Sequence, residues 1–245
     1  MSVLVHEKSY KGKSIVQVIH RSRLKKLIAI LKDLELNDGS IWADFGCSNG
    51  FILSLIQNEV VSNNWSFYGF DHKAELLEMG RQKQLQNTEF HQFDLNIINY
   101  NFSNFFDVVT CFETLEHTGN YKNAFENLYI SCKVNGLIVI SIPNETGVPG
   151  MLKFFGRKLK RRNVYGDFFG NKSELNYISQ LLRGGNIELF RDRERTGWGP
   201  HLGFDYRSFE DFLTKGYIAE NKCVLLNKHS SFLNFNRFYI IKKVS

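Results

Sequence analysis

A glycine-rich turn and the acidic residues around it are the part of this sequence best suited to do chemistry. Residues 41–53 are typical of a strand, a turn and the start of a helix, and Asp44, Gly46 and Gly50 form the pattern Asp-x-Gly-x-x-x-Gly. Glycines at such a turn let the backbone approach a ligand closely, and the free N–H groups of the new helix attract anionic atoms. The same pattern also fits an ordinary strand-to-helix turn, so one glycine loop is weak evidence alone.

Two further aspartates follow the next two apolar runs of the chain. Asp71 ends the run 67–71, at the position where folds of this kind bind the two hydroxyls of a ribose, although it could also cap the helix that follows. Asp94 follows the third run. Because the carboxyl ends of parallel strands meet at one edge of a sheet, these acids and Asp44 predict a nucleotide ligand at that edge.

The composition of the turn indicates which nucleotide is bound. A dinucleotide fold would have Gly-x-Gly-x-x-Gly, but Ser48 takes the place of the middle glycine. Asp44 precedes the turn, where its carboxylate can hold the amino group of an amino-acid ligand. This arrangement favours S-adenosylmethionine over NAD.

The elements that must position these residues alternate along the chain. A helical pattern covers 14–34, and from there short β-type runs alternate with helical runs. The β-type runs are 41–45, 66–70, 89–93, 107–112 and 136–142, and the helical runs are 51–61, 73–84 and 121–132. Alternation of this kind predicts a parallel sheet with helices on both faces, a doubly wound α/β fold.

The last hundred residues have a different pattern. From 144 to 206 there is no clean alternation; a helix is then predicted from Ser208, with Asp211 as its capping-box partner and Gly216 as its end. Two β-type runs, 222–227 and 235–242, are joined by a turn too short for a parallel crossover, which predicts an antiparallel hairpin.

The motifs as a set resemble those of a known enzyme class. The glycine loop resembles the first motif of class I S-adenosylmethionine-dependent methyltransferases. Residues 107–117 (DVVTCFETLEH) and 135–144 (NGLIVISIPN) closely resemble the ubiquinone-biosynthesis O-methyltransferase type and relatives from surface-glycan biosynthesis clusters. The resemblance covers about 21–144 and returns in the terminal hairpin.

This resemblance implies a Rossmann-like methyltransferase fold. The sheet would be mostly parallel and seven-stranded, with an antiparallel last strand and a cap inserted after the fifth strand. The chain would form one domain, 1–245. Its parts would be an N-terminal helical segment (1–36), a cofactor-binding core (37–144), an acceptor cap (145–206), and a C-terminal helix and hairpin (207–245).

The resemblance also implies S-adenosyl-L-methionine as cofactor, S-adenosyl-L-homocysteine as product, and a set of binding residues. The methionine part would lie among Asp44, Gly46, Cys47, Ser48 and Gly50, Asp71 would bind the ribose hydroxyls, Asp94 and Leu95 would lie at the adenine, and Cys111 and Phe112 would flank the sulfonium. His72 is a further candidate cofactor-binding residue. Arg21 or Arg23 would pair with the methionine carboxylate, unless both belong to a solvated basic helix face. Cys47 and Ser48 replace the glycine-rich centre that many members have.

Candidates for a general base lie where the acceptor is expected. They are His117 after the fourth strand, and His201 with Asp205 before the late helix, although His117 could equally fix a loop and some enzymes of this class need no base beyond water. Glu116 is interpreted as a helix-start residue. The segment after the fourth strand matches neither the Asn/Asp-Pro-Pro-aromatic motif of amino-methyltransferases nor the Pro-Cys arrangement of cytosine-carbon enzymes. We therefore expect an oxygen acceptor on a small molecule, a sugar or glycan, or a lipid-linked saccharide.

Charge and composition set the remaining expectations. The chain has a net charge of +6, and the segment 151–162 holds six basic residues and no acid, with Leu152, Phe155 and Leu159 at helical spacing. Such a segment can meet an anionic membrane surface, clamp a phosphate, or be a solvated helix. One alternative is an RNA methyltransferase that uses 153–162, although nucleic acid is the less favoured partner. A separate alternative is a non-catalytic partner subunit that binds the cofactor.

Cysteine usage and hydropathy place the protein in the cytoplasm by default. The four cysteines include no Cys-x-x-Cys pair, so we predict no disulfide frame and no metal site. The apolar stretches are shorter than the roughly 20 residues of a membrane span, so any membrane association would be peripheral, at the inner membrane surface.

Overall fold

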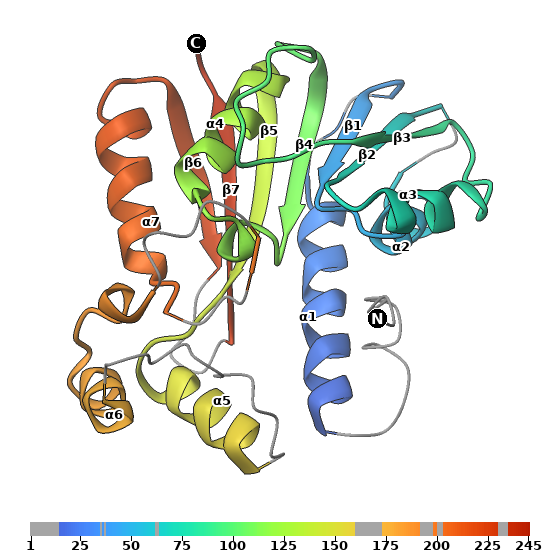
Figure 1. The fold of residues 1–245 in the computed structure, drawn as a ribbon. Coiled ribbons are helices and arrows are strands. Elements are labelled where there is room, and N and C mark those ends of the chain that lie inside the picture. Colours follow the sequence, from blue (N-terminus) through green and yellow to red (C-terminus); the bar gives the residue numbers. More distant parts are fainter. Residues whose placement is uncertain are drawn as a thin grey trace.

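One seven-stranded sheet organises the residues that the structure, a computed structural model, describes: 15–34, 36, 38–61, 64–159, 173–191, 198–199, 203–229 and 235–245. The strand order is β3-β2-β1-β4-β5-β7-β6 (Figure 1). The strands are β1 (Ile41–Phe45), β2 (Ser66–Asp71), β3 (Thr88–Gln92), β4 (Phe106–Phe112), β5 (Cys132–Pro143), β6 (Cys223–His229) and β7 (Asn236–Lys243).

The pairing confirms the predicted fold class. Strands β1 to β5 run parallel, β7 pairs antiparallel with β5, and β6 pairs antiparallel with β7. Strands β1 and β4 are neighbours, and the strand order reverses between them: β2 and β3 extend the sheet from β1, and β5, β7 and β6 extend it from β4. Ligands of open α/β sheets bind at the carboxyl ends of the strands at such a switch point.

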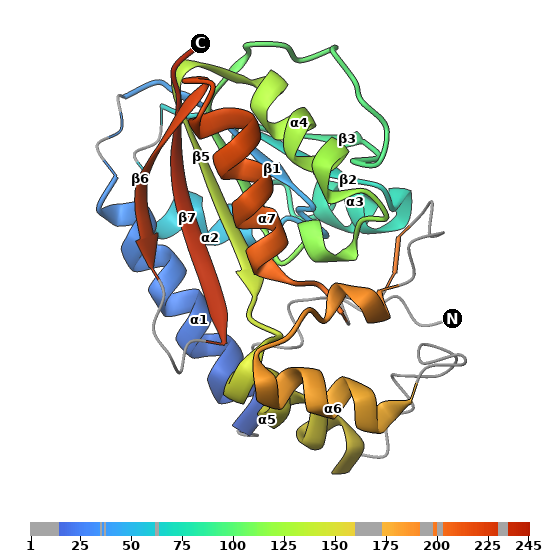
Figure 2. The same ribbon diagram turned by 90° about the vertical axis from the view of Figure 1, so that its left-hand side faces the viewer.

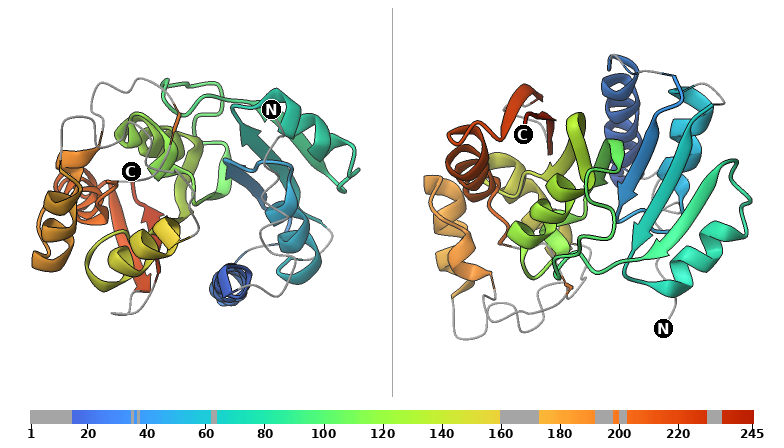
Figure 3. Two further views of the ribbon diagram at one scale, coloured as in Figure 1. Left: turned by 60° about the horizontal axis from the view of Figure 1, so that its bottom comes forward. Right: turned by 90° about the horizontal axis from the view of Figure 1, so that it is seen from above.

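Helices cover both faces of the sheet because its strands alternate apolar side chains to the two sides. Trp42 packs with α1 (Ile15–Lys32), α2 (Phe51–Glu59) and α3 (Ala74–Arg81). Its neighbour Ala43 belongs to the opposite core, which holds α4 (Tyr121–Ser131) and α7 (Tyr206–Leu213). Figures 2 and 3 show α1 and α2 on one side of the sheet and α4 and α7 on the other.

The segment after β5 forms a separate small layer beneath the carboxyl edge of the sheet (Figure 1). It contains α5 (Gly147–Leu159), α6 (Glu174–Arg183) and the 3₁₀ turn η4 (Glu188–Phe190). These elements share a core of their own made of Phe154, Tyr177, Leu181, Ile187 and Phe190. This layer occupies the place of the predicted cap insertion after the fifth strand, while the exact residue division of the chain stays a prediction.

The late helix differs from its prediction at both ends. Its N-cap is Asp205, whose Oδ1 accepts from the Arg207 N–H at 3.0 Å, so the expected capping role of Ser208 was wrong. Gly216 does not end the helix either, because it lies inside a π-helical turn, η5 (Thr214–Ile218), that continues α7. The helical stretch ends at Ile218, and Asn221 in the turn that follows has a φ of 55°.

Candidate active site

The glycine turn joins β1 to α2 and folds against the end of β2. The N–H groups of Gly46 and Cys47 both donate to the Phe70 carbonyl, at 2.7 and 3.0 Å. Gly46 has a φ of 81°, and a Cβ placed on it would lie 2.1 Å from Oγ1 of Thr114. Only glycine therefore lets the turn lie directly against the segment after β4.

Asp71 ties this turn to the start of α3. Its Oδ2 accepts from the Ser48 N–H and its Oδ1 from the Lys73 N–H, both at 2.9 Å. Asp71 is not the N-cap of α3, which is Lys73, but its carboxylate lies at the strand-end edge beside the glycine turn, where the ribose role stays a prediction.

Asp44 is buried at the end of β1, next to the crossover strand β4. Its Oδ1 accepts from the Thr110 hydroxyl at 2.8 Å. Burial raises the pKa of the Asp44 carboxyl to about 7, because the charged form loses its hydration; the Thr110 hydrogen bond opposes this rise and the nearby Asp71 adds to it. A cationic amino group placed beside Asp44 would favour its ionised form.

A cleft of about 70 Å³ opens between the glycine turn, α1 and the end of β4. Its lining residues include four with a buried polar atom that has no hydrogen-bond partner in the described structure: Ser48 Oγ, Asn49 Oδ1, Arg23 Nε and Asn236 Oδ1. Buried polar atoms are normally satisfied, so this set indicates a place prepared for a polar ligand. Arg23 also pairs with Glu113 at 3.0 Å. Of the two arginines proposed for the methionine carboxylate, Arg23 lines the cleft, whereas Arg21 does not.

The purine end of the predicted site is occupied by a tryptophan. The Trp198 indole stacks on His72 with ring centroids 3.9 Å apart and planes at 8°, and its Nε1 donates to Asp94 Oδ1 at 3.0 Å. His72 also lies 3.4 Å from Asp71, while Leu95 is buried in the neighbouring core. Burial lowers the pKa of His72, which favours the neutral imidazole.

Cys111 and Phe112 end β4 at the expected place. Phe112 lines the cleft, whereas Cys111 is fully buried beside it. Burial raises the pKa of the Cys111 thiol well above its ordinary value, and burial does the same for Cys47. Both thiols are therefore protonated, unreactive packing groups.

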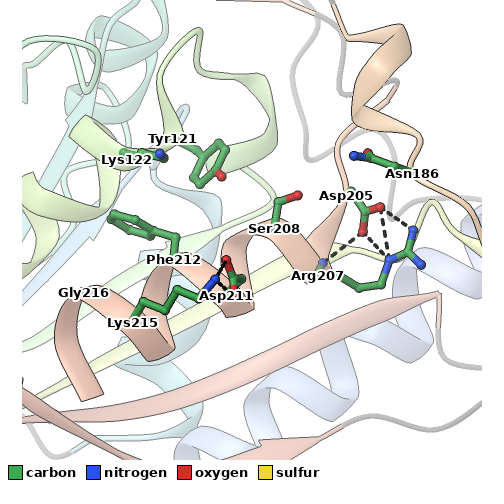
Figure 4. Close-up of a pocket in the computed structure, with 10 residues that line it drawn as sticks. All are labelled: Tyr121, Lys122, Asn186, Asp205, Arg207, Ser208, Asp211, Phe212, Lys215 and Gly216. Atoms are coloured by element: carbon green, nitrogen blue, oxygen red, sulfur yellow. Dashed lines mark hydrogen bonds and ion pairs between the residues drawn. The ribbon is translucent and has the colours of Figure 1, made fainter. Parts of the chain in front are cut away.

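The three residues predicted as candidate bases are His117, Asp205 and His201, and the structure describes the surroundings of the first two. The His117 Nδ1 donates to the Gly199 carbonyl at 2.7 Å, and the Gly199 N–H donates back to the His117 carbonyl at 2.9 Å. Asp205 is buried and forms an ion pair with Arg207 at one end of an open hollow of about 700 Å³ between α4 and α7 (Figure 4). His201 lies outside the residues that the structure describes.

Two acidic residues follow β4, Glu113 and Glu116, and they affect each other's charge. Glu116 lies in the first turn of the 3₁₀ helix η2 (Leu115–His117) and is buried, with Oε2 lacking a hydrogen-bond partner among the described atoms. Burial raises its pKa well above the ordinary value, and the nearby Glu113 adds to this. The spacing of these acids in residues 113–117 was visible in the sequence, but the burial of Glu116 was not.

The described part of the basic segment 151–162 is bonded within the fold. Lys153 donates to Glu145 at 2.9 Å and to the carbonyls of Asn144 and Phe235. Lys158 pairs with Glu174 of α6 at 2.5 Å. The side chain of Arg157 and residues 160–162 lie outside the described part of the chain.

Comparison with protein families now decides the class. A family model described as a methyltransferase domain matches residues 19–208, which is most of the chain. The chain belongs to this methyltransferase family. No curated protein sequence matches it.

Solved methyltransferase structures share the fold. CurJ carbon methyltransferase superposes with a TM-score of 0.59 at 16% identity, covering 98% of this chain and 58% of the other, so this chain spans little more than half of that protein. Magnesium protoporphyrin IX methyltransferase from Synechocystis PCC 6803, with bound SAH, gives a TM-score of 0.60 at 16% identity over 97% and 92% of the two chains. A SAM-dependent methyltransferase from Aquifex aeolicus gives 0.55 at 14% identity over 91% and 98%.

The predicted class of S-adenosylmethionine-dependent methyltransferase is thereby confirmed, and S-adenosylmethionine is its cofactor. The residues present fit this molecule, because the cleft beside the glycine turn is lined by buried polar atoms that have no partner among the described residues. Among the described residues, no helix of this methyltransferase combines the length and apolar character that a membrane crossing requires.

Proposed function

We propose that this methyltransferase acts on a hydroxyl oxygen of a small-molecule, sugar or lipid-linked acceptor. The observation that carries this proposal is the state of the end of β4 and the residues directly after it. The Cys111 thiol there is buried with a raised pKa, so it does not suit a mechanism that needs a cysteine nucleophile. Residues 111–114 (CFET) also lack the Asn/Asp-Pro-Pro-aromatic motif that holds a planar amino group. Both features favour an oxygen acceptor over an amino group or a cytosine carbon.

The cofactor side of the reaction uses the residues around the cleft. When bound, S-adenosylmethionine supplies a methyl group on a positively charged sulfur. Asp44 and Arg23 would hold the charged amino and carboxylate groups of its methionine part, and Asp71 would hold the ribose hydroxyls. With the donor fixed, the remaining task of the chain is to align the acceptor and take up its proton.

His117 is the residue we propose for that proton. Its Nδ1 faces a carbonyl, which can only accept, so Nδ1 carries the hydrogen and Nε2 carries the lone pair in the neutral ring. Nε2 would take the hydroxyl proton as the acceptor oxygen forms its bond to the methyl carbon and the carbon–sulfur bond breaks. Asp205 is less suited to this role because its carboxylate is engaged by Arg207 and by the start of α7.

The role of His117 is tested with His117→Ala, and His91→Ala serves as the control because His91 lies on β3, away from the end of β4. Loss of a general base lowers the rate of transfer by about 10²–10⁴-fold. We expect that loss in His117→Ala, with S-adenosylhomocysteine affinity within about threefold of wild type. Unchanged turnover in His117→Ala would show that water suffices as the base.

The acceptor class is tested by following the label. The protein is incubated with methyl-labelled cofactor and extract of the host, and lipid, glycan, RNA and small-molecule fractions are separated. We expect label in the glycan, lipid or small-molecule fraction. Label in RNA would instead support the RNA methyltransferase alternative, and no label despite tight cofactor binding would support the non-catalytic partner subunit. Lys153 and Lys158 form ion pairs within the protein, which disfavours an RNA-binding surface made from these two residues.

A lipid-linked acceptor is supported by one face of α5. Val148, Leu152 and Phe155 follow helical spacing and are all exposed, and Arg157 and Lys158 belong to the same helix. We propose that this face meets an anionic membrane surface. Sedimentation with anionic vesicles should carry the wild type down and leave Leu152→Ser/Phe155→Ser in solution. Equal behaviour of the two proteins would exclude this role for α5.

A further inference from the structure

The ring stack at the strand-end edge places a bicyclic, flat, nitrogen-bearing side chain where the purine of the cofactor is expected. Trp198 lies against His72, the residue after β2, and donates its ring N–H to Asp94, which follows β3. Adenine offers the same features: a flat bicyclic ring that can stack and an N–H donor on its edge. The surroundings that hold the indole are therefore the surroundings that would hold a purine.

The indole and a purine cannot occupy this slot together. Stacked rings need about 3.5–4 Å on each face, so a ring inserted between Trp198 and His72 would require their centroids to be about 7 Å apart. They are 3.9 Å apart in the structure. Asp94 Oδ1 is also used, because it accepts from Trp198 Nε1 and from both the backbone and side-chain N–H groups of Asn96.

The shape of the cleft agrees with an occupied purine slot. Its lining runs from Arg23 through the glycine turn to the end of β4, and it contains none of Asp71, His72 and Asp94. Its volume of about 70 Å³ is well below the roughly 300 Å³ at which ligand sites of small molecules begin. Among the residues that the structure describes, this cleft therefore corresponds to the methionine end of the site.

The residue next to Trp198 is fixed to the acceptor side of the site. Gly199 exchanges two hydrogen bonds with His117, one through its N–H at 2.9 Å and one through its carbonyl at 2.7 Å. The position of Trp198 is therefore tied to the residue that we propose as the base. Expulsion of the indole would change the surroundings of His117.

We propose that Trp198 fills the purine subsite of the empty enzyme and must leave it before the adenine of S-adenosylmethionine can enter. Trp198 then acts as a competing internal ligand. The apparent Kd of both cofactor and product equals the intrinsic Kd divided by the fraction of molecules in which the slot is open. This inference rests on the assignment of S-adenosylmethionine as cofactor.

The first test compares S-adenosylhomocysteine binding by calorimetry in wild type, Trp198→Ala and Trp198→Phe. If the open state makes up 10% of the molecules or less, Trp198→Ala should bind at least about tenfold more tightly. Trp198→Phe keeps a stacking ring but loses the N–H donor, so its affinity should be intermediate. Weaker binding in Trp198→Ala would show that the indole instead covers the bound adenine, and unchanged binding would show that it does not compete; either result overturns the proposal.

The second test reads the indole itself. The other two tryptophans, Trp42 and Trp65, are buried in the core, so a change in fluorescence on ligand addition reports Trp198. Adenosine should shift the emission to the red and increase quenching by acrylamide, methionine should do neither, and Trp198→Phe should show no response to adenosine. Reduced quenching on adenosine addition would mean that the ring is covered rather than expelled, which contradicts the proposal.

These measurements separate the two claims. Absence of S-adenosylhomocysteine binding in wild type and in every folded variant would overturn the cofactor assignment and the proposal with it. Binding that is present but insensitive to Trp198→Ala would overturn only the proposal. His72→Ala serves as the matched variant, since it removes the stacking surface for both rings and should weaken binding relative to Trp198→Ala.

Discussion

The glycine-turn region and the cap layer handle their buried polar groups in opposite ways. In the glycine-turn region, Ser48 Oγ and Asn49 Oδ1 are buried without partners among the described atoms. In the cap layer, Lys153 and Glu145 satisfy each other in a buried ion pair. The first region has buried polar atoms that a ligand could bind, whereas the second pairs its buried charges internally above its own apolar core. The contrast explains why the cofactor could be inferred from the site and the acceptor only proposed.

The largest expected effect tests the internal bonding of the cap. Lys153→Met removes the ammonium group that pairs with the buried Glu145 carboxylate, which should lower the free energy of unfolding by about 3–5 kcal/mol. Lys153→Met/Glu145→Gln removes both charges and should recover most of that loss. Urea unfolding measures both, and S-adenosylhomocysteine affinity of the double variant should stay within about threefold of wild type. A mild effect of Lys153→Met would mean that the pair does not stabilise the cap.

The next effect comes from making the same substitution in both regions. Gly46→Ala places a Cβ against Thr114 at a positive φ, so it should cost about 2–4 kcal/mol of stability and abolish measurable S-adenosylhomocysteine binding. Gly156→Ala in α5 meets no atom within 4 Å and should stabilise the protein by about 0.5–1 kcal/mol with binding intact. Thermal unfolding and calorimetry on the two variants check this. Similar behaviour of both would remove the special role of the turn.

A smaller effect is the pH dependence of the glycine-turn region. With its pKa raised to about 7, Asp44 loses its charge as pH falls through 7, so S-adenosylhomocysteine affinity should fall by up to about tenfold per pH unit below that point. The stability of the empty protein should change in the other direction. Because the folded state binds this proton more tightly than the unfolded state, the contribution of Asp44 is lost as pH rises from about 4 to 7.

Asp44→Asn keeps an oxygen that can accept from Thr110 but cannot ionise. We expect its S-adenosylhomocysteine affinity to be weak and nearly constant between pH 6 and 8 in calorimetric titrations. A wild-type affinity that does not change over this range would contradict the assignment of Asp44 to the amino group.

The smallest effect concerns the N-cap of α7. Asp205→Ala should cost about 1 kcal/mol of unfolding free energy, because it removes the side-chain acceptor for the first turn. Ser208→Ala should have no measurable effect, although the sequence alone favoured Ser208 as the cap. Neither should change S-adenosylhomocysteine affinity more than about twofold. A larger loss in Ser208→Ala than in Asp205→Ala would contradict the observed helix start.

The parts of the protein that sequence predicts well are those fixed by local pattern. Strand and helix periodicity gave the sheet and its antiparallel end, and the glycine turn with Asp71 gave the nucleotide edge, because these depend on residues close together in the chain. The choice between Arg21 and Arg23 depended on which face of α1 meets the turn.

The parts that sequence did not predict depend on distant contacts. The sequence shows Lys153 as one of six basic residues in a short segment, and only the fold places it against Glu145 and the Phe235 carbonyl. Trp198 follows no motif, and only the fold brings it to His72 and Asp94, more than 100 residues earlier in the chain. The placement of α7 likewise depended on which of two acceptors, Asp205 or Ser208, reached the first turn.

The most direct test of the account is calorimetric titration of S-adenosylhomocysteine into wild type, Asp71→Ala and Asp205→Ala. The account predicts micromolar-range binding by wild type and Asp205→Ala. In Asp71→Ala, the loss of a charge-assisted hydrogen-bond partner should weaken binding by about 1.5–3 kcal/mol, or roughly 10- to 150-fold. No binding by the folded wild type, or binding that Asp71→Ala leaves unchanged, would contradict the central claim that this strand-end edge holds the cofactor.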